Sequence, residues 1–238
     1  MKFALRHWLA VAMLPLMCAQ PASAQTPAPA PAPAPAYDGP MYVVSYIETA
    51  PAAAAKTRAM LAAFAKSARK ESGNTAFIAL QRVGEPNFFT VLEAWKDKDA
   101  QVAHAAAAST RAFRDSVEPM LRAPYDERPH MALAANPLKA AGKSAVYVVT
   151  HVDIVPTSKD LGIDLNKTLA ESSRSEGAIS FDLWQQASRG NHLTLVEAWK
   201  DRKALDAHNS ADAVKGYRGK FASISGSPYD IRVFKSID

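Results

Sequence analysis

The sequence predicts an α+β fold in which two copies of one unit pack together within a single chain. Residues 195–218 repeat the pattern of residues 91–114, and ten of the 24 positions are identical without a gap. Residues 146–156 also match residues 41–51, and a Pro-Tyr-Asp phrase at 124–126 returns at 228–230. Such repetition indicates a duplicated structural unit of roughly 100 residues.

Each copy is expected to run β-α-β-β-α-β, the order of the ferredoxin-like split unit. Pro51 and Pro156 end the first strands and open helices, and Asp97 and Asp201 stand where a helix N-cap belongs. In the first copy, at 41–138, strands are expected at 42–47, 76–83, 88–95 and 130–134, and the second helix at about 98–121. In the second copy, at 144–238, they are expected at 147–152, 179–186, 192–199 and 231–235, with the second helix at about 202–224.

One such unit covers only one face of its sheet with helices, so the other apolar face needs a partner. The linker at 136–145 allows the two sheets to stack within one chain. The sequence therefore predicts an intrachain pseudo-dimeric α+β barrel made of two ferredoxin-like repeats.

The first 40 residues are not expected to belong to the barrel. A basic start with Lys2 and Arg6, a short apolar run and Ala22-Ser23-Ala24 predict a signal peptide at 1–24 that is cleaved after Ala24. The mature protein is then expected in the periplasm or secreted, with no stable membrane span. Residues 25–40 are rich in Pro and Ala, which predicts an extended linker that is either a spacer or a tail without a specific role.

Composition excludes several kinds of function. Cys18 is the only cysteine, so cleavage would leave no disulfide and no thiolate ligand. Without Lys2 and Arg6 the formal charge falls from +5 to +3, which is too little to predict a nucleic-acid partner. The histidines of the predicted repeats are scattered along the chain, and no metal site is predicted from them.

Alternation along a strand places Glu93 with Trp95, and Glu197 with Trp199, on one row of the third strand of each repeat. The opposite row carries small residues such as Ala94 and Ala198, which suit the face under a helix. The Glu and Trp rows are therefore expected to point into the space between the two sheets. A carboxylate there needs a partner, and Arg128 and Arg232 are the candidates. Both a structural ion pair and a catalytic carboxylate remain open.

His104 and His208 occupy the same place in the two copies, beside a stripe of alanines on the second helix. A histidine at the margin of a buried stripe either completes the core or lines a pocket, and the pattern leaves both readings open.

These residues carry a family resemblance. The segment from Glu197 and Trp199 through His208 to Tyr217 resembles the signature of the antibiotic biosynthesis monooxygenase family, and the first copy matches it with Glu93, Trp95, His104 and Phe113. The family fold is a dimeric α+β barrel, usually made from two chains. The resemblance to its quinol-oxidising members implies a small aromatic substrate, dioxygen and no cofactor. Arg114 and Arg218 stand where the haem-degrading branch has its ligand histidine.

The implied chemistry needs a base that deprotonates an electron-rich phenol, so that the anion can pass an electron to dioxygen. His208 and His104 are the predicted bases because the unperturbed pKa of histidine is about 6.5. Trp199 and Trp95 are predicted to stack on the ring, Tyr217 to donate a hydrogen bond, and Arg218 or Arg232 to stabilise negative charge. Glu197, Glu93 and Phe113 complete the predicted substrate-binding set.

The second copy is expected to hold the better site. It has His151 where the first copy has Tyr46, and Trp184 where the first has Leu80. Two alternatives to a monooxygenase remain open: a non-catalytic binder of a small apolar or aromatic molecule, and a purely structural duplicated domain. Homodimerisation beyond the internal pairing is also left open.

Overall fold

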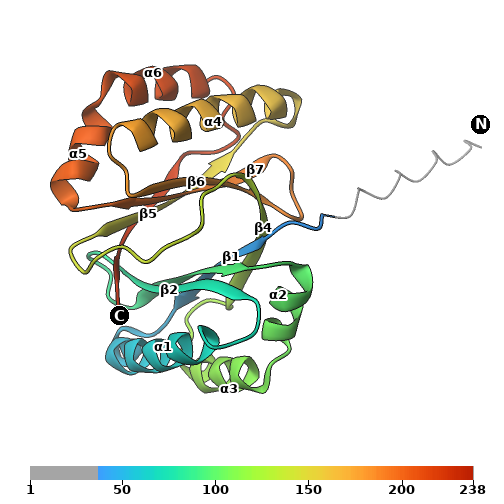
Figure 1. Cartoon of the computed structure of the whole chain (residues 1–238). Coiled ribbons are helices and arrows are strands. Elements are labelled where there is room, and N and C mark those ends of the chain that lie inside the picture. Colours follow the sequence, from blue (N-terminus) through green and yellow to red (C-terminus); the bar gives the residue numbers. More distant parts are fainter. Residues whose placement is uncertain (1–36, 238) are drawn as a thin grey trace, which may run out of the picture. The chain divides into compact units, whose positions relative to one another are not determined.

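The computed structural model describes residues 37–237, so the predicted signal peptide and residues 25–36 of the predicted linker lie outside the described residues. Within this part, eight strands form a closed barrel, and helices cover it on two opposite sides (Figure 1). The first repeat comprises β1 (Met41–Glu48), α1 (Ala54–Ala68), β2 (Asn74–Arg82), β3 (Phe88–Trp95), α2 (Lys98–Ala105), α3 (Ala108–Val117) and β4 (Asp126–Ala134). The second comprises β5 (Val146–Asp153), α4 (Lys159–Ser175), β6 (Ser180–Gln186), β7 (His192–Trp199), α5 (Arg202–Ser210), α6 (Asp212–Phe221) and β8 (Asp230–Ser236).

The barrel closes because the last strand of each repeat also pairs with the other repeat. The strand order is β1-β3-β2-β8-β5-β7-β6-β4, and every pairing is antiparallel. β8 lies between β5 of its own repeat and β2 of the first, and β4 lies between β1 and β6. Closure leaves no free sheet edge. The predicted pseudo-dimeric α+β barrel is confirmed.

The first helix of each repeat begins as the sequence predicts. Pro51 and Pro156 open short 3-10 turns, Pro51–Ala53 and Pro156–Ser158, that lead into α1 and α4. Proline suits this place because its missing N–H would have no partner in the first turn.

The prediction of one long second helix in each repeat is wrong. The backbone is extended at Ala107, with ψ 146°, and at Ala211, with ψ 144°, so α2 and α3 are separate helices, as are α5 and α6. Alanine is the strongest helix former, and residues 105–108 are all alanine. Tertiary packing of the two short helices on the sheet therefore overrides local propensity here.

The predicted direction of the Glu and Trp rows is also wrong. Trp95 packs in one core cluster with Phe64 of α1 and Phe113 of α3, and Trp199 packs with Leu169 of α4 and Phe221 of α6. The small row, including Ala94 and Ala198, faces the barrel interior instead. The barrel interior also holds large side chains such as Trp184 and Tyr147, so side-chain size does not decide the direction; the helix layer supplies the apolar partners of Trp95 and Trp199.

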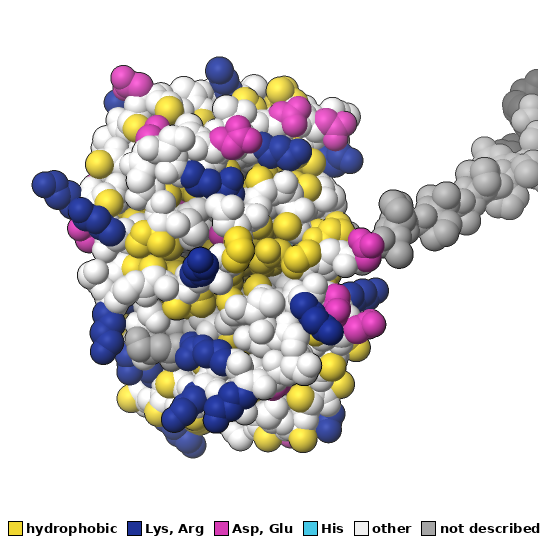
Figure 2. All heavy atoms as spheres, viewed as in Figure 1, with side chains coloured by type: hydrophobic (Ala, Val, Ile, Leu, Met, Phe, Trp, Pro, Cys, Tyr) yellow, Lys and Arg dark blue, Asp and Glu magenta, His cyan; other side chains and the backbone are white. Residues whose placement is uncertain are grey.

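The barrel interior forms a third core cluster shared by both repeats. It joins Tyr42 and Val44 of β1 to Tyr147 and Val149 of β5, and Leu138 of the connecting segment packs into the same cluster. Figure 2 shows apolar side chains gathered midway between the two helix layers, while Lys and Arg are scattered over both repeats. No helix within 37–237 combines the length and the apolar character needed to cross a membrane.

Candidate active site

Each repeat buries a carboxylate that is held by the indole two residues further along its strand. Trp95 Nε1 donates to Glu93 Oε2 at 2.9 Å, and Trp199 Nε1 donates to Glu197 Oε2 at 2.8 Å. Residues i and i+2 of a strand point to the same face, so the strand itself sets this contact. The predicted partners of these carboxylates are wrong, because Arg128 and Arg232 bind Asp126 and Asp230, two residues earlier on their own strands.

The following helix brings a histidine onto each tryptophan. Asp97 and Asp201 cap α2 and α5 by accepting from the backbone N–H three residues later, each at 2.8 Å. This start places His104 and His208 in the last turn, where both are buried and stack on Trp95 and Trp199 with ring centroids 4.5 Å apart.

A second glutamate holds the outer nitrogen of each histidine. His104 Nδ1 lies 2.7 Å from Glu71 Oε2, and its Nε2 lies 3.7 Å from Glu93 Oε2. In the second repeat, His208 Nδ1 lies 3.4 Å from Glu176 Oε2. The His104 imidazole therefore lies between a buried carboxylate and one that reaches the surface, and His208 has the surface-reaching carboxylate on its outer side and lines the same cavity as Glu197.

Burial shifts the pKa of these groups. Removal from water raises the pKa of Glu93 to about 8 and that of Glu197 to about 7, although the indole N–H bond opposes the rise in both. The same effect lowers the pKa of His208, and the neighbouring Glu176 opposes it. Near neutral pH both protonation states of Glu197 are therefore populated, and burial favours the neutral form of His208.

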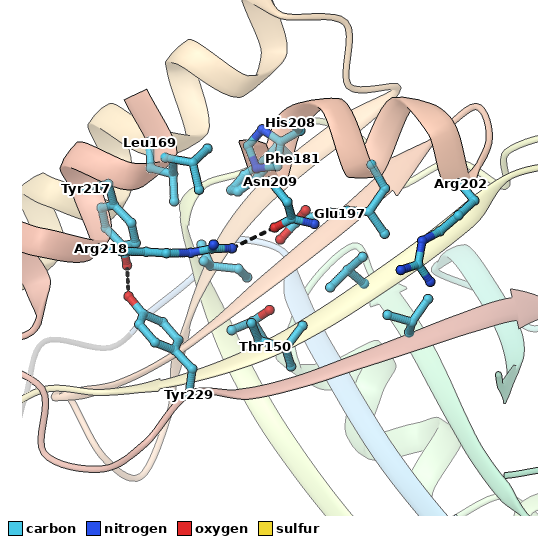
Figure 3. A pocket seen from close by; sticks show the side chains of 16 residues that line it. Thr150, Leu169, Phe181, Glu197, Arg202, His208, Asn209, Tyr217, Arg218 and Tyr229 are labelled. Atoms are coloured by element: carbon cyan, nitrogen blue, oxygen red, sulfur yellow. Dashed lines mark hydrogen bonds between the residues drawn. The ribbon is translucent and has the colours of Figure 1, made fainter. Parts of the chain in front are cut away.

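The second repeat has a cavity of about 240 Å³ between its sheet and helices α4, α5 and α6 (Figure 3). Glu197, His208, Tyr217 and Arg218 line it, as the sequence predicts, with Phe181, Leu169 and Tyr229 among the further residues. Tyr229 O–H donates to the Tyr217 hydroxyl at 2.6 Å, and Tyr217 O–H donates to Asn166 Oδ1 at 2.8 Å. Arg218 Nη2 donates to Asn209 Oδ1 at 2.6 Å.

In the first repeat, larger side chains occupy the corresponding space. Phe64, which stands where the second repeat has Leu169, stacks on Phe113 with ring centroids 4.3 Å apart and an interplanar angle of 2°. Arg114 forms an ion pair with Glu127, which replaces Ile231 of the cavity wall. The two repeats thus share the Glu, Trp and His arrangement, and the second combines it with an open cavity.

Trp199 was predicted to stack on a substrate ring, but it does not line the cavity; it stacks on His208 and donates to Glu197. Three further predicted site residues lie elsewhere. Trp184 packs on Tyr42 inside the barrel, with ring centroids 4.7 Å apart. His151 and Arg232 lie at one end of the barrel, where His151 Nε2 accepts from the Tyr46 hydroxyl at 2.6 Å. All three are on strand positions that face the barrel interior, on the opposite side of the sheet from the cavity.

Several residues that line the cavity or hold its lining residues were not predicted as site residues. Tyr229 lies in the Pro-Tyr-Asp phrase that both copies repeat, and this repetition was the available signal. Asn166 and Glu176 carry no such signal, because they reach the site from α4 and from the residue after it. Within residues 37–237, no group of three His, Cys, Asp or Glu side chains is placed to hold a metal ion.

Comparison with known proteins finds the same repetition. The family described as "Antibiotic biosynthesis monooxygenase" matches this chain twice, at residues 40–116 and 145–220. A Synechocystis protein described as uncharacterized is 29% identical over 91 residues. The matched residues are 38% of this chain, and they span 62% of that protein's length. "Putative monooxygenase YcnE" of Bacillus subtilis is 30% identical over 87 residues, which are 36% of this chain and 92% of that protein.

The whole barrel also has a structural counterpart. The crystal structure of a "Putative monooxygenase" from Fusobacterium nucleatum matches with a TM-score of 0.76 at 16% identity, over 85% of this chain and 94% of that one. At this identity the likeness establishes the fold alone.

Proposed function

The chain belongs to the antibiotic biosynthesis monooxygenase family, and we propose that it oxidises an electron-rich phenol or quinol with dioxygen, without a cofactor, in the cavity of the second repeat. The observation that carries this proposal is Glu197. It is a buried carboxyl on the cavity wall, it is fixed by the Trp199 N–H, and its pKa of about 7 suits proton transfer near neutral pH.

Glu197 is the group we assign to take the phenol proton. A carboxylate accepts a proton best when its pKa is close to the working pH, and burial brings Glu197 there. His208 lines the same cavity and has Glu176 on its outer side, so it is placed to pass the proton towards the surface. That His208 is the first base remains a prediction. Substituting Glu197 and His208 one at a time distinguishes the two candidate bases.

The reaction balances without an added reductant. Ionised Glu197 removes the phenol proton, and the phenolate passes one electron to dioxygen, giving an aryloxyl radical and superoxide. The two radicals form a C–O bond at a ring carbon that bears hydrogen, and the resulting peroxide anion takes a proton back from the Glu197 carboxyl, giving a hydroperoxide and an ionised Glu197 again. Loss of water from the resulting hydroperoxide leaves a quinone, so that phenol and O₂ become quinone and H₂O. The protein has to hold the anion and exclude bulk water while this happens.

The remaining lining residues fit a flat aromatic molecule. Phe181, Leu169 and Leu195 give the cavity apolar walls, and the hydrogen-bonded hydroxyls of Tyr217 and Tyr229 stand on the side of α6 and β8 (Figure 3). The Arg218 guanidinium also lines the cavity, where it can stabilise a phenolate.

Oxygen uptake with a panel of hydroquinones and naphthols tests the proposal. We expect Glu197→Gln to lower the rate by about 100-fold, which is typical of a lost general base. Glu93→Gln, the matched change in the first repeat, is expected to leave the rate unchanged. Equal rates in Glu197→Gln and in the unchanged protein would exclude Glu197 as the base. A loss only in His208→Ala would assign the base to the histidine. Ligand binding without oxygen consumption would favour a non-catalytic binder.

We also propose that the mature protein acts in the periplasm or outside the cell. The proposal rests on the basic start, the apolar run and the Ala22-Ser23-Ala24 site at 1–24. Mass spectrometry of the protein from periplasmic and cytoplasmic fractions should find a mature chain that begins at Gln25. An uncleaved chain confined to the cytoplasm would refute it.

A further inference from the structure

A second cavity, of about 490 Å³, lies at the end of the barrel where β1 ends and β3 begins. It is lined from inside the barrel by Tyr46, Thr90 and Phe234, and from the rim by Phe88, Phe89 and Tyr125. None of its lining residues belongs to the second-repeat cavity. We call it the barrel-end cavity.

The second repeat has a pseudo-equivalent recess of about 190 Å³ at the same end of the barrel. There, His151 stands in place of Tyr46, His192 in place of Phe88, and Gln186 in place of Arg82. The recess is therefore small and polar where the barrel-end cavity is larger and aromatic. Divergence between the two copies, rather than the shared fold, produced the barrel-end cavity.

A hydrogen-bonded chain satisfies the polar groups beside the smaller recess. Tyr46 O–H and Arg128 Nη1 donate to His151 Nε2, at 2.6 and 3.1 Å. His151 Nδ1–H then donates to Thr194 Oγ1 at 3.2 Å, and the Thr194 hydroxyl donates to His130 Nε2 at 2.9 Å. His130 Nδ1–H donates to the Arg128 carbonyl at 2.7 Å, which fixes the direction of the chain.

The matching hydroxyl in the barrel-end cavity has no such partner. Thr90 occupies the place of Thr194, but Phe234 stands where His130 would be, and Tyr46 is turned to His151. The Thr90 hydroxyl is fully buried and has no hydrogen-bond partner among the described residues. A buried polar group is normally bonded, so the Thr90 hydroxyl on this cavity wall is available to bond a ligand or a water molecule.

The charges on the wall indicate which ligand fits. The Arg82 and Arg232 guanidinium groups are paired with Glu85 and Asp230, and Asp126 is paired with Arg128, so these lining charges are already balanced and do not favour an ion. The Arg232 guanidinium lies over the Tyr46 ring at 4.7 Å, and Arg82 lies over Phe88 at 5.4 Å, which makes a wall of stacked flat groups. Guanidinium N–H groups can donate to a neutral oxygen.

We propose that the barrel-end cavity binds an uncharged flat aromatic molecule that carries a carbonyl or hydroxyl oxygen, with its ring against Phe88 and Tyr46 and its oxygen towards Thr90 and the guanidinium groups. The site is separate from the second-repeat cavity and does not depend on the reaction proposed there.

Calorimetric titration of the mature chain with coumarin, a neutral aromatic carbonyl compound, tests the site. The double variant Arg82→Gln/Phe88→His copies the second repeat and is expected to weaken binding by about tenfold or more, because it removes a ring and a donor. Leu169→Phe copies the first repeat and fills the other cavity, so it should leave this binding intact. Binding that is lost in Leu169→Phe and retained in the double variant would overturn the proposal, as would no binding at all.

Two further measurements keep the test decisive if the double variant does not fold. Thr90→Val removes only the unbonded hydroxyl and is expected to weaken coumarin binding about threefold to tenfold. Coumarin-3-carboxylate, the anionic analogue, should bind more weakly than coumarin. Unchanged affinity in Thr90→Val, or tighter binding of the anion, would show that the ligand class is wrong.

Discussion

Replacing Glu93 by Gln should stabilise the protein at alkaline pH and leave it unchanged in acid. The Glu93 side chain is 4% exposed, and its only ordinary hydrogen bond in the described residues comes from Trp95 Nε1. Gln has the same shape and keeps an acceptor oxygen for that N–H, but it never ionises. The substitution therefore removes the cost of a buried charge without opening a cavity.

The size of the effect follows from the pKa of Glu93, which burial raises from 4.5 to about 8. A raised pKa means that the folded protein binds the proton more tightly than the unfolded chain. The stabilisation is complete below pH 4.5 and is lost as pH rises through 8. At about 1.4 kcal/mol per pKa unit, the loss is about 4 to 5 kcal/mol.

Urea denaturation followed by tryptophan fluorescence at pH 5, 7 and 9 measures this difference, because Trp95, Trp184 and Trp199 are all buried. The free energy of unfolding of Glu93→Gln should exceed that of the unchanged protein by no more than about 1 kcal/mol at pH 5 and by several kcal/mol at pH 9. Comparing two proteins at each pH cancels the opposite trend from buried His130 and His151, whose pKa values burial lowers to about 3 and about 4.

Glu171→Gln, an exposed change on α4, is the matched control and should give no difference at any pH. A difference between Glu93→Gln and the unchanged protein that stays constant from pH 5 to pH 9 would refute the reasoning.

Three other outcomes are expected. The value of kcat/KM for oxygen uptake should rise with pH and level off above about 7, because the ionised form of Glu197 accepts the proton. A profile that falls over this range would contradict the role of Glu197 as the base. Thr194→Val should cost about 1 to 3 kcal/mol of unfolding free energy, because it breaks the hydrogen-bonded chain between two buried histidines, whereas Thr90→Val should cost almost nothing. Equal losses for the two variants in urea denaturation would show that these hydrogen bonds contribute no stability. Gly84→Ala should lower the free energy of unfolding by about 1 to 2 kcal/mol because of its positive φ alone. Gly73→Ala should lower it clearly more, since the new Cβ would also lie 2.6 Å from that of Ala100, and thermal unfolding should rank the two variants in this order.

The sequence predicted the repeats, the order of strands and helices, and the pairing of Glu with Trp, because each depends on local pattern. The strand β3 found at Phe88–Trp95 coincides with the predicted one, and the pleat alone puts Glu93 and Trp95 on one side. The helix caps at Asp97 and Asp201 were equally local. Each cap fixes where its helix begins, and helix geometry then places the histidine, one to two turns later, against the tryptophan.

The side of the sheet that carries the site could not be predicted in the same way. Alternation separates two rows but does not say which row faces the helices. The breaks at Ala107 and Ala211, which divide the helix layer of each repeat, occur where the sequence has neither Gly nor Pro. Arg232 was predicted near Glu197, but Asp230, on the same strand, provides a closer carboxylate.

The sequence by itself determined that this protein is a duplicated family member with a Glu, Trp and His set in each half. The contacts within each set involve only a few residues of one strand and the helix that follows it. Only the tertiary structure decided that Glu197 of the second set lines a cavity between sheet and helices, whereas in the first set only His104 reaches a recess, at the surface. That difference depends on Leu169 against Phe64, and on Ile231 against Glu127, which reach the site from distant parts of the chain. Whether a space is filled is set by the summed volumes of all the side chains that meet there, and the fold determines which side chains meet.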